Sequence, residues 1–161
     1  MKTTILLLLL ILTLGAAPPV PATGARESEW TEYVSGVWAG KSVRVETEYR
    51  LADQSRVDIY STVRRFGWDE DSAWEVDRAA KWKEAIGQAA FYQEMTGSAS
   101  AGVVLLCLGG KHDELNKIRC AIACHRCQLG LVIVTADGTI SQYPTNTLYS
   151  LRERLLKEKR R

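Results

Sequence analysis

Hydrophobic and polar residues alternate with a strand-like period in the first half of the chain and with a helix-like period in much of the second half. Val43, Val45 and Tyr49 share one face of a strand, whereas the unbroken apolar run at 102–108 is typical of a strand buried on both sides. The pattern predicts, in chain order, a short helix at 29–38, strands at 42–50 and 56–61 joined by a turn at 53–55, a loop at 67–72, a strand at 73–77, a helix at 81–95, a strand at 102–108, a helix at 112–127, a strand at 131–135 and a final amphipathic helix around 148–156. This order predicts an α/β sandwich whose mixed sheet begins with an antiparallel hairpin and continues with parallel crossovers.

The start of the chain has the pattern of a secretory signal rather than of a folded element. Lys2 precedes an apolar run at 5–14, which is followed by small residues and a proline-rich stretch. A run of this length is too short to span a bilayer, which takes about 20 residues. We therefore expect residues 1–25 to form a signal peptide and linker, and residues 26–161 to form one domain. The mature protein, secreted or periplasmic, should begin between about residues 18 and 26 and have no stable membrane insertion. An uncleaved signal that anchors the chain to a membrane is the alternative.

Charge is spread unevenly along the chain. The net charge is only +2, so the whole chain lacks the basic character that is typical of nucleic-acid-binding proteins. Residues 150–161 nevertheless hold six Lys and Arg, which makes the predicted final helix basic. Such a helix end is most simply a solvated surface, and contact with phosphates is the alternative.

The most distinctive chemistry lies between residues 74 and 92. Glu75 and Asp77 are two positions apart on a predicted strand and therefore point to the same side of the sheet. On the following helix, Lys81, Gln88 and Tyr92 fall within roughly 40° of one another. A stripe centred about 120° away would pack on the sheet, and it is formed by Trp82, Ile86, Ala89 and Ala90. The helix thus has an apolar face to bury and a separate polar row beside two strand carboxylates.

Three segments in this order resemble the PD-(D/E)xK nuclease superfamily. They are Arg56-Val57-Asp58-Ile59, then Glu75-Val76-Asp77, then a helix that carries Gln88-x-x-x-Tyr92. The Gln-x-x-x-Tyr motif is similar to that of RecB-type nucleases, so the nearest resemblance is to small bacterial members with this motif. The resemblance covers roughly residues 46–135. It implies a restriction-endonuclease-like αβββαβ core, in which a mixed central sheet is flanked by helices.

The resemblance also implies a set of metal-binding carboxylates. Carried over from the family motif, Asp58 on the second core strand and Glu75 on the third would bind a divalent metal. The family has a lysine two residues after this glutamate, where the present chain has Asp77. Asp77 is therefore interpreted as an additional ligand or an orienting partner. Glu46 and Glu48 on the first strand are candidates to complete the acidic cluster, and Glu48 is the preferred one.

The missing lysine can be supplied from the neighbouring helix. Lys81 shares the helix edge of Gln88 and Tyr92, whereas Lys83 lies roughly 200° around the helix from Lys81. We therefore assign the lysine's catalytic role to Lys81. Gln88 and Tyr92 are expected to hold phosphate oxygens or to brace the metal ligands.

The implied activity is hydrolysis of phosphodiester bonds with Mg²⁺ or Mn²⁺ as cofactor. A carboxylate-bound divalent ion lowers the pKa of bound water and neutralises charge on the phosphate, and a lysine adds a compact cation. The expected substrate is DNA, with RNA as the alternative, and a homodimer is open. Two rival interpretations remain: a catalytically inactive nuclease-fold binding module, and an unrelated exported interaction protein in which the motif is coincidental.

The four cysteines do not have the geometry of a zinc site. Cys120, Cys124 and Cys127 fall on one face of the predicted helix at 112–127, but His125 is turned roughly 140° away from them. In an oxidising compartment we expect these thiols to form a disulfide or an intermolecular link instead. Cys107 belongs to the buried strand and is interpreted as a small core residue.

Overall fold

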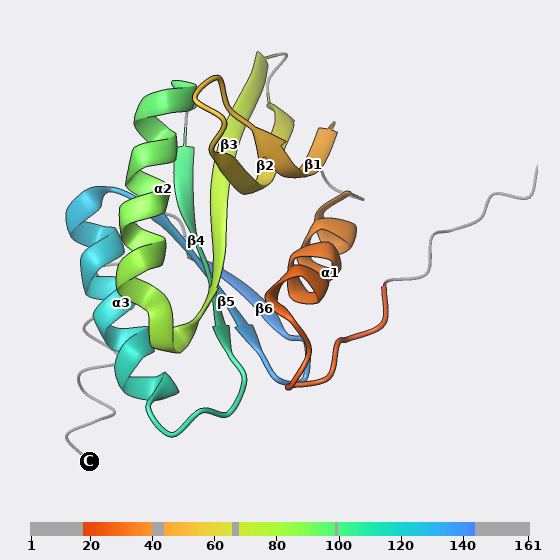
Figure 1. The fold of residues 1–161 in the computed structure, drawn as a ribbon, viewed down its shortest axis with the longest axis vertical. Helices are drawn as coiled ribbons and strands as arrows, with labels where there is room; N and C mark the ends of the chain where they lie inside the picture. The colour runs from red at the N-terminus through yellow and green to blue at the C-terminus, as the bar shows by residue number, and fades with distance from the viewer. Residues whose placement is uncertain (1–17, 40–43, 66–67, 99, 144–161) are drawn as a thin grey trace, which may run out of the picture.

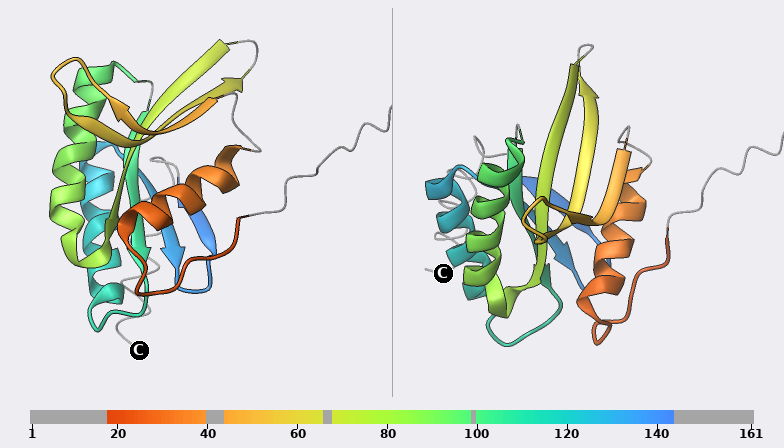
Figure 2. Two further views of the ribbon diagram at one scale, coloured as in Figure 1. Left: turned by 45° about the vertical axis from the view of Figure 1, so that its right-hand side comes forward. Right: turned by 45° about the horizontal axis from the view of Figure 1, so that its top comes forward.

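The computed structural model describes residues 18–39, 44–65, 68–98 and 100–143, which form three layers (Figures 1 and 2). A six-stranded sheet in the order β1-β2-β3-β4-β5-β6 lies between helix α1 on one face and helices α2 and α3 on the other. The elements are α1 (Glu27–Ala39), β1 (Arg44–Arg50), β2 (Arg56–Arg65), β3 (Trp68–Arg78), the 3₁₀ turn η1 (Ala79–Lys81), α2 (Trp82–Thr96), β4 (Ser100–Cys107), α3 (Asp113–Cys127), β5 (Gly130–Thr135) and β6 (Ile140–Tyr143). The predicted α/β class with a mixed sheet is confirmed.

The sheet combines an antiparallel start with a parallel centre, as the order of elements predicts. Strands β1, β2 and β3 pair antiparallel, and β3, β4 and β5 pair parallel. Strand β4 is buried along almost its whole length because helices or strands cover both of its faces, which accounts for its apolar run. Strand β6, antiparallel to β5, was not predicted. Its four residues are too few to show an alternating pattern.

The prediction of a loop at 67–72 is wrong, because β3 begins at Trp68. The residues that follow Trp68, at 69–72, are polar, yet they pair with β2 through side chains as well as backbone. Arg64 donates to Asp69 across the hairpin at 2.9 Å, and the Thr62 hydroxyl donates to Asp71 at 2.7 Å. Such cross-strand pairs stabilise a polar strand without burying it, so hydrophobic alternation does not reveal it.

Helix α2 packs on the sheet in a different orientation from the predicted one. Its buried residues are Ala85, Ala89 and Tyr92, whereas Trp82 and Ile86 are only half-buried and Ala90 is exposed. The small alanine side chains let the helix approach the sheet closely, and the bulky residues pack along its flank. Lys81 belongs to η1 rather than to α2, so the 100° spacing used to place it does not apply there. On the opposite face of the sheet, Trp30 and Val34 of α1 form a second core with Trp74 and Val76.

The segment before α1 lies against the folded domain. Pro18 contacts Gly36, where an added Cβ atom would come within 2.9 Å of the proline ring, and Val20 lies still closer to Gly138, where an added Cβ atom would come within 2.5 Å of it. Residues 18–25, predicted to be a linker, are thus packed on the domain.

The predicted signal at 1–17 and the basic final helix lie outside the described residues. No helix within the described ranges is both long and apolar enough to cross a membrane.

Candidate active site

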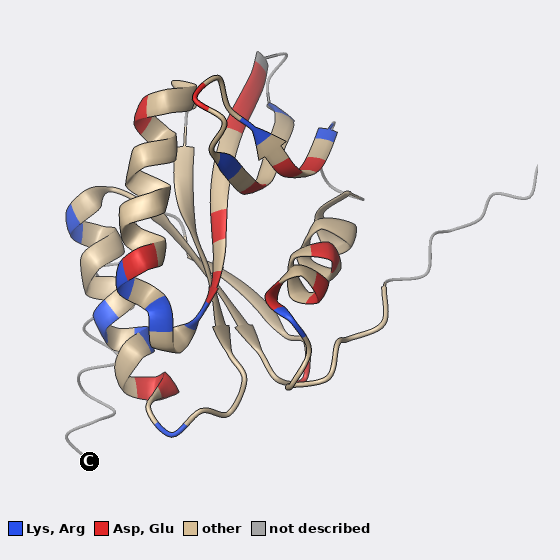
Figure 3. Ribbon diagram, viewed as in Figure 1, with Lys and Arg blue, Asp and Glu red and all other residues tan. Residues whose placement is uncertain are grey.

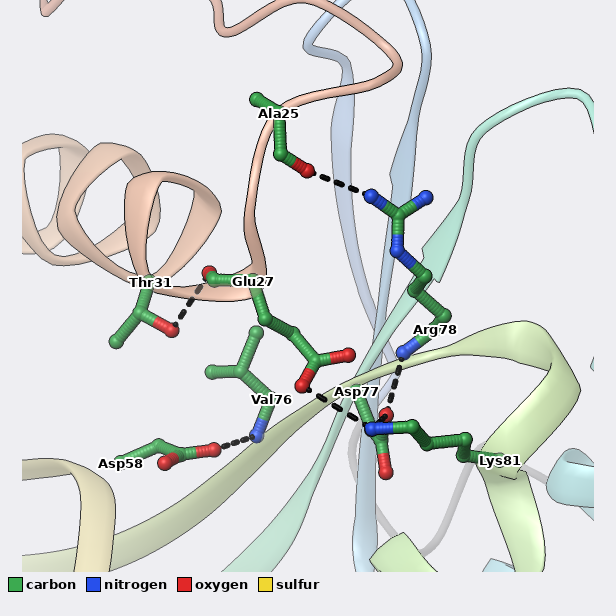
Figure 4. A network of polar contacts seen from close by, with 8 residues as sticks. All are labelled: Ala25, Glu27, Thr31, Asp58, Val76, Asp77, Arg78 and Lys81. Atoms are coloured by element: carbon green, nitrogen blue, oxygen red, sulfur yellow. Dashed lines mark hydrogen bonds and ion pairs between the residues drawn. The ribbon is translucent and has the colours of Figure 1, made fainter.

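Strands β2 and β3 separate at the point where the predicted carboxylates lie. Their backbone pairing runs from Arg65–Trp68 to Ile59–Trp74. Beyond that pair, a side-chain hydrogen bond takes the place of the backbone hydrogen bonds between the two strands. The Oδ2 atom of Asp58 accepts a hydrogen bond from the backbone N–H of Val76 at 2.7 Å (Figure 4). Since Val76 lies between Glu75 and Asp77, this bond fixes the carboxylate of Asp58 beside the two acidic residues of β3.

Glu75 and Asp77 occupy one side of β3, as the strand period predicts. Their neighbours Trp74 and Val76 pack in the core on the α1 side, so the two acidic side chains point the other way. Both are buried, with 6% and 4% exposure. The Oε2 atom of Glu75 is buried without a hydrogen-bond partner among the described residues. An unpartnered buried carboxylate oxygen costs free energy, so it calls for a functional explanation.

Lys81 reaches this cluster from η1 and contacts two carboxylates. Its Nζ lies 3.4 Å from Oδ1 of Asp77 and 3.4 Å from Oε1 of Glu27, the first residue of α1 (Figure 4). The N–H of Arg78 also donates to Asp77, and the Arg78 guanidinium donates to the carbonyl oxygens of Thr23 and Ala25. Arg78 therefore fastens the segment before α1 to the end of β3, which holds Glu27 near the cluster.

The half-buried Asp58 and the buried Glu75 and Asp77 hold their protons more tightly than ordinary Asp and Glu. Burial, with smaller contributions from Glu48 and Glu27, raises the pKa of Asp58 to about 6, although the bond from Val76 opposes this. Burial and repulsion from Asp58 and Asp77 raise the pKa of Glu75 to about 8. Burial and a hydrogen bond with the Glu27 carboxyl raise the pKa of Asp77 to about 7. The cluster thus has more negative charge than its surroundings balance.

The single lysine responds in the opposite direction. The negative charges of Asp77 and then Glu27 raise the pKa of Lys81, so its ammonium stays charged at neutral pH. Its side chain is half exposed. Lys81 is therefore a fixed cation at the solvent side of the carboxylates. Lys83 points elsewhere, with its Nζ 5.9 Å from the centre of the Trp82 ring.

The remaining predicted residues divide into two that join the cluster and one that does not. Tyr92 is buried on α2, and its pKa is raised by burial and then by the charges of Glu75 and Asp58. Glu48 lies near enough for its charge to raise the pKa of Asp58, and it forms an ion pair with Arg56 at 3.1 Å. Its backbone has a φ of 53°, which is strained for a residue other than glycine. Gln88 is exposed and makes no hydrogen bond with the described residues.

Glu27 is the member of the cluster that sequence reasoning missed. The sequence predicted the first helix to begin at residue 29, so Glu27, which the structure places in the first turn of α1, lay before it, and no motif distinguishes Glu27 from the acidic Glu29. Glu29 bonds to Arg26 on the surface, whereas Glu27 faces Asp77 and Lys81. How α1 docks on the sheet decides which of the two residues reaches the cluster. The one available signal in the sequence was an acidic residue near the start of a helix.

The donor chemistry of the cluster suits a hard divalent cation, because it consists of carboxylate oxygens alone. In the described part of the chain, however, no three His, Cys, Asp or Glu side chains already stand where they could hold a metal ion together. Asp77 is engaged by Lys81 and Glu27, and the bond to Val76 occupies one oxygen of Asp58. Binding of a cation would therefore require these side chains to turn toward the unpartnered oxygen of Glu75.

The cysteines form no site of this kind. All four are free thiols, and three of them, Cys107, Cys120 and Cys124, are buried in the core between the sheet and α2–α3. The sulfur atoms of Cys120 and Cys124 lie 3.9 Å apart on consecutive helical turns. Burial raises the pKa of Cys107 to about 12, so this thiol is an unreactive core residue. Cys127 is exposed.

Comparison with known proteins adds no family to this picture. No protein-family model matches the chain, and no curated protein shows significant similarity to it.

Proposed function

We propose that this protein is a divalent-metal-dependent nuclease with a restriction-endonuclease-like core. The observation that carries the proposal is a group of carboxylates, the half-buried Asp58 and the buried Glu75 and Asp77, gathered where β2 and β3 separate. The order α1-β1-β2-β3-α2-β4 also follows the αβββαβ order expected from the sequence resemblance. The six-stranded sheet would then be that core extended by α3, β5 and β6.

A structural role does not account for the cluster. Burying charged groups costs several kcal/mol each unless good partners compensate. Here Asp58 and Asp77 raise the pKa of Glu75, and Glu27 raises the pKa of both Asp58 and Asp77. The positive charge of Lys81 compensates for this only in part. Apolar residues at these positions would stabilise the fold better. Buried carboxylates that are kept despite this free-energy cost are characteristic of a site that binds a cation or transfers protons.

The chain's own residues can be given roles in hydrolysis. Bound Mg²⁺ or Mn²⁺ would supply an acidified water and neutralise charge on the phosphate, held by Asp58, Glu75 and Asp77 with Glu48 as a further carboxylate. Lys81 orients the attacking water or stabilises the charge that develops on the phosphate. Tyr92 braces Glu75 from α2, and Asp77 with Glu27 fixes the position of the Lys81 ammonium.

The proposed substrate is DNA, with RNA as the alternative, and the proposed compartment is secreted or periplasmic. Figure 3 shows acidic residues along β3 and at the start of α1, and basic residues on the lower parts of α2 and α3. A polyanionic substrate would approach the acidic centre only with its metal bound, because the cation inverts the local charge.

An inactive binding module with the same fold is the second candidate function. The observation in its favour is that Asp77 stands where the family has lysine, while Lys81 is already paired with two carboxylates. Such a module would bind nucleic acid without cleaving it. Turnover therefore separates the two candidates.

The test is incubation of the purified protein, keeping residues 18–25, with linear and circular DNA and with RNA in Mg²⁺, Mn²⁺ or EDTA. We expect cleavage in Mg²⁺ or Mn²⁺ and none in EDTA. Glu75→Gln should abolish cleavage, whereas Asp69→Asn on the same strand should not. Binding without cleavage under all metal conditions would favour the inactive module, and cleavage that persists in EDTA or in Glu75→Gln would contradict the proposed site.

A further inference from the structure

A crevice lies next to the carboxylate cluster, at the carboxyl ends of β3 and β4. Its volume is about 330 Å³, within the range of small-ligand sites, roughly 300–1,000 Å³. In sheets with parallel strands, ligands commonly bind outside the carboxyl ends of those strands. Three segments line the crevice: 23–24 before α1, 78–80 at η1, and the region from Leu106 to Asp113 between β4 and α3.

Two of these segments also build the carboxylate cluster. Thr23 and Gly24 lead within a few residues to Glu27, and Arg78 to Ala80 connects Asp77 with Lys81. The Arg78 guanidinium ties the two segments together through the carbonyl oxygens of Thr23 and Ala25. The crevice and the cluster are therefore built from the same two segments of the chain, so a ligand in the crevice would lie beside the cluster.

The lining of the crevice is amphipathic. The half-buried Leu108, together with the buried Leu106 and Ala79, supplies an apolar wall. Arg78 supplies a cation where its guanidinium contacts the carbonyl oxygens of Thr23 and Ala25. Asp113 lies at the other end, where its Oδ2 accepts the N–H groups of Gly109 and Gly110 at 3.0 and 2.8 Å. Its Oδ1 accepts no hydrogen bond from the described residues and is available to a hydroxyl or amino group. A phosphate is favoured at the Arg78 end, and an uncharged group with donors is favoured at the Asp113 end.

We propose that this crevice binds the sugar and base of the nucleotide adjoining the phosphate that the carboxylate cluster cleaves. The inference rests on the proposed nuclease function and assigns to it a nucleotide subsite. The apolar wall would cover one face of the sugar or base, Asp113 would accept a hydrogen bond from it, and Arg78 would contact the flanking phosphate.

Gly24 offers a way to fill the crevice without disturbing the fold. It lines the crevice, and a Cβ atom added there would have nothing within 4 Å. Gly87 on α2 is equally open but distant from the crevice, so Gly87→Leu is the matched control. Gly24→Leu should fill the space a nucleotide needs, and Gly24→Ala should have an intermediate effect.

The experiment records amide NMR spectra of the protein during titration with deoxyadenosine monophosphate, deoxyadenosine or inorganic phosphate, with Mg²⁺ and with EDTA. We expect the nucleotide and the nucleoside to shift the amides of Gly109 and Gly110 at the Asp113 end, and inorganic phosphate, which is favoured only at the Arg78 end, to leave these two amides unchanged. Gly24→Leu should weaken the nucleotide affinity by about tenfold or more, while Gly87→Leu preserves it. In cleavage assays Gly24→Leu should raise KM by a similar factor.

The outcomes separate this inference from the proposed function. Cleavage by the wild-type protein with equal KM in Gly24→Leu and Gly87→Leu overturns the subsite and leaves the nuclease proposal intact. Nucleotide-dependent shifts without any cleavage keep the crevice as a nucleotide site and overturn the nuclease. Unchanged amides in the wild-type protein, or equal shifts with inorganic phosphate, overturn the subsite whether or not the protein cleaves DNA.

Discussion

The two halves of β3 carry similar acidic residues in opposite electrostatic environments. In the first half, Asp69 is half exposed and pairs with Arg64, whose hydrogen bonds lower its pKa. In the second half, Glu75 and Asp77 are buried, and their pKa values are raised to about 8 and about 7. One strand thus holds acidic residues that its hairpin partner satisfies and acidic residues that the fold leaves unbalanced.

The difference follows from where β2 accompanies β3. Along the first half, the antiparallel partner presents Arg64 and Thr62 opposite the carboxylates. Past Trp74 the partner strand leaves, and Asp58 brings another carboxylate instead of a cation. The partners of acidic residues, rather than their number, therefore indicate which of them serve a function. The comparison can be tested at both ends of the strand.

The largest expected effect is on activity. Glu75→Gln keeps the shape of the side chain but removes its negative charge, so cleavage of DNA in Mg²⁺ should fall by about 10³-fold, the scale of losing a major electrostatic partner of the transition state. Asp69→Asn should cleave at the wild-type rate. Equal rates in both variants, measured on linear DNA at saturating metal, would remove the functional distinction between the two halves of the strand.

The next effect concerns the cation that serves the buried half. Lys81→Ala should lower cleavage by about 10²-fold, because Lys81 is the lysine in contact with Asp77 and Glu27. Lys83→Ala is the control, since Lys83 lies over Trp82 and outside the cluster. Thermal unfolding of both variants should stay close to that of the wild type. A greater loss of cleavage in Lys83→Ala would show that the wrong lysine has been assigned.

The parts of the site that depend on strand periodicity could be predicted from the sequence. The parts that depend on how helices dock on the sheet could not. Glu75 and Asp77 share a side of β3 because alternate strand residues always do. Glu27 was missed because its approach depends on how α1 packs on the sheet. The apolar stripe of α2 was misplaced because helix periodicity gives relative angles, while the close approach allowed by Ala85 and Ala89 decides which face is buried.

The fold shows the same division between local pattern and partnership. The continuous apolar run predicted β4 as a buried strand because burial on both faces requires it. The start of β3 was assigned to a loop because its polar residues depend on Arg64 and Thr62 of another strand for their stability. Local patterns therefore predict elements buried by their own composition better than elements stabilised by a particular partner.

The third prediction concerns stability, for which the two halves should differ in sign. The pKa of Glu75 is about 8 in the folded protein against an ordinary value of 4.5, so between these pH values the folded chain retains a proton that the unfolded chain has released. Without metal, stability should therefore fall as pH rises through this window. Glu75→Gln should remove the part of that dependence that belongs to Glu75, leaving the smaller parts of Asp58 and Asp77, and stabilise the metal-free protein at pH 8 by about 1–2 kcal/mol.

Asp69 should behave in the opposite way. Its lowered pKa means that its contribution is present above the unfolded value and is lost as pH falls through the folded one, so Asp69→Asn should lower stability at neutral pH slightly. Denaturant unfolding in EDTA from pH 8 down to below the ordinary Asp pKa of 3.8 checks both signs. Destabilisation at pH 8 in Glu75→Gln would show that the buried carboxyl serves the fold.

The smallest expected effect separates functional strain from ordinary turn geometry. Glu48 beside the cluster and Gln54 in the β1–β2 turn both have positive φ values, 53° and 74°, which glycine adopts without strain. Either Glu48→Gly or Gln54→Gly should therefore raise the free energy of unfolding by about 0.5–1 kcal/mol. Only Glu48→Gly should also lower cleavage, because it removes a carboxylate that acts on Asp58.

Glu48→Gln keeps the strain and removes the charge, so it should lose activity without gaining stability. Full activity in both Glu48 variants, measured beside Gln54→Gly, would mean that the strain at Glu48 belongs to the path of β1 and not to the site.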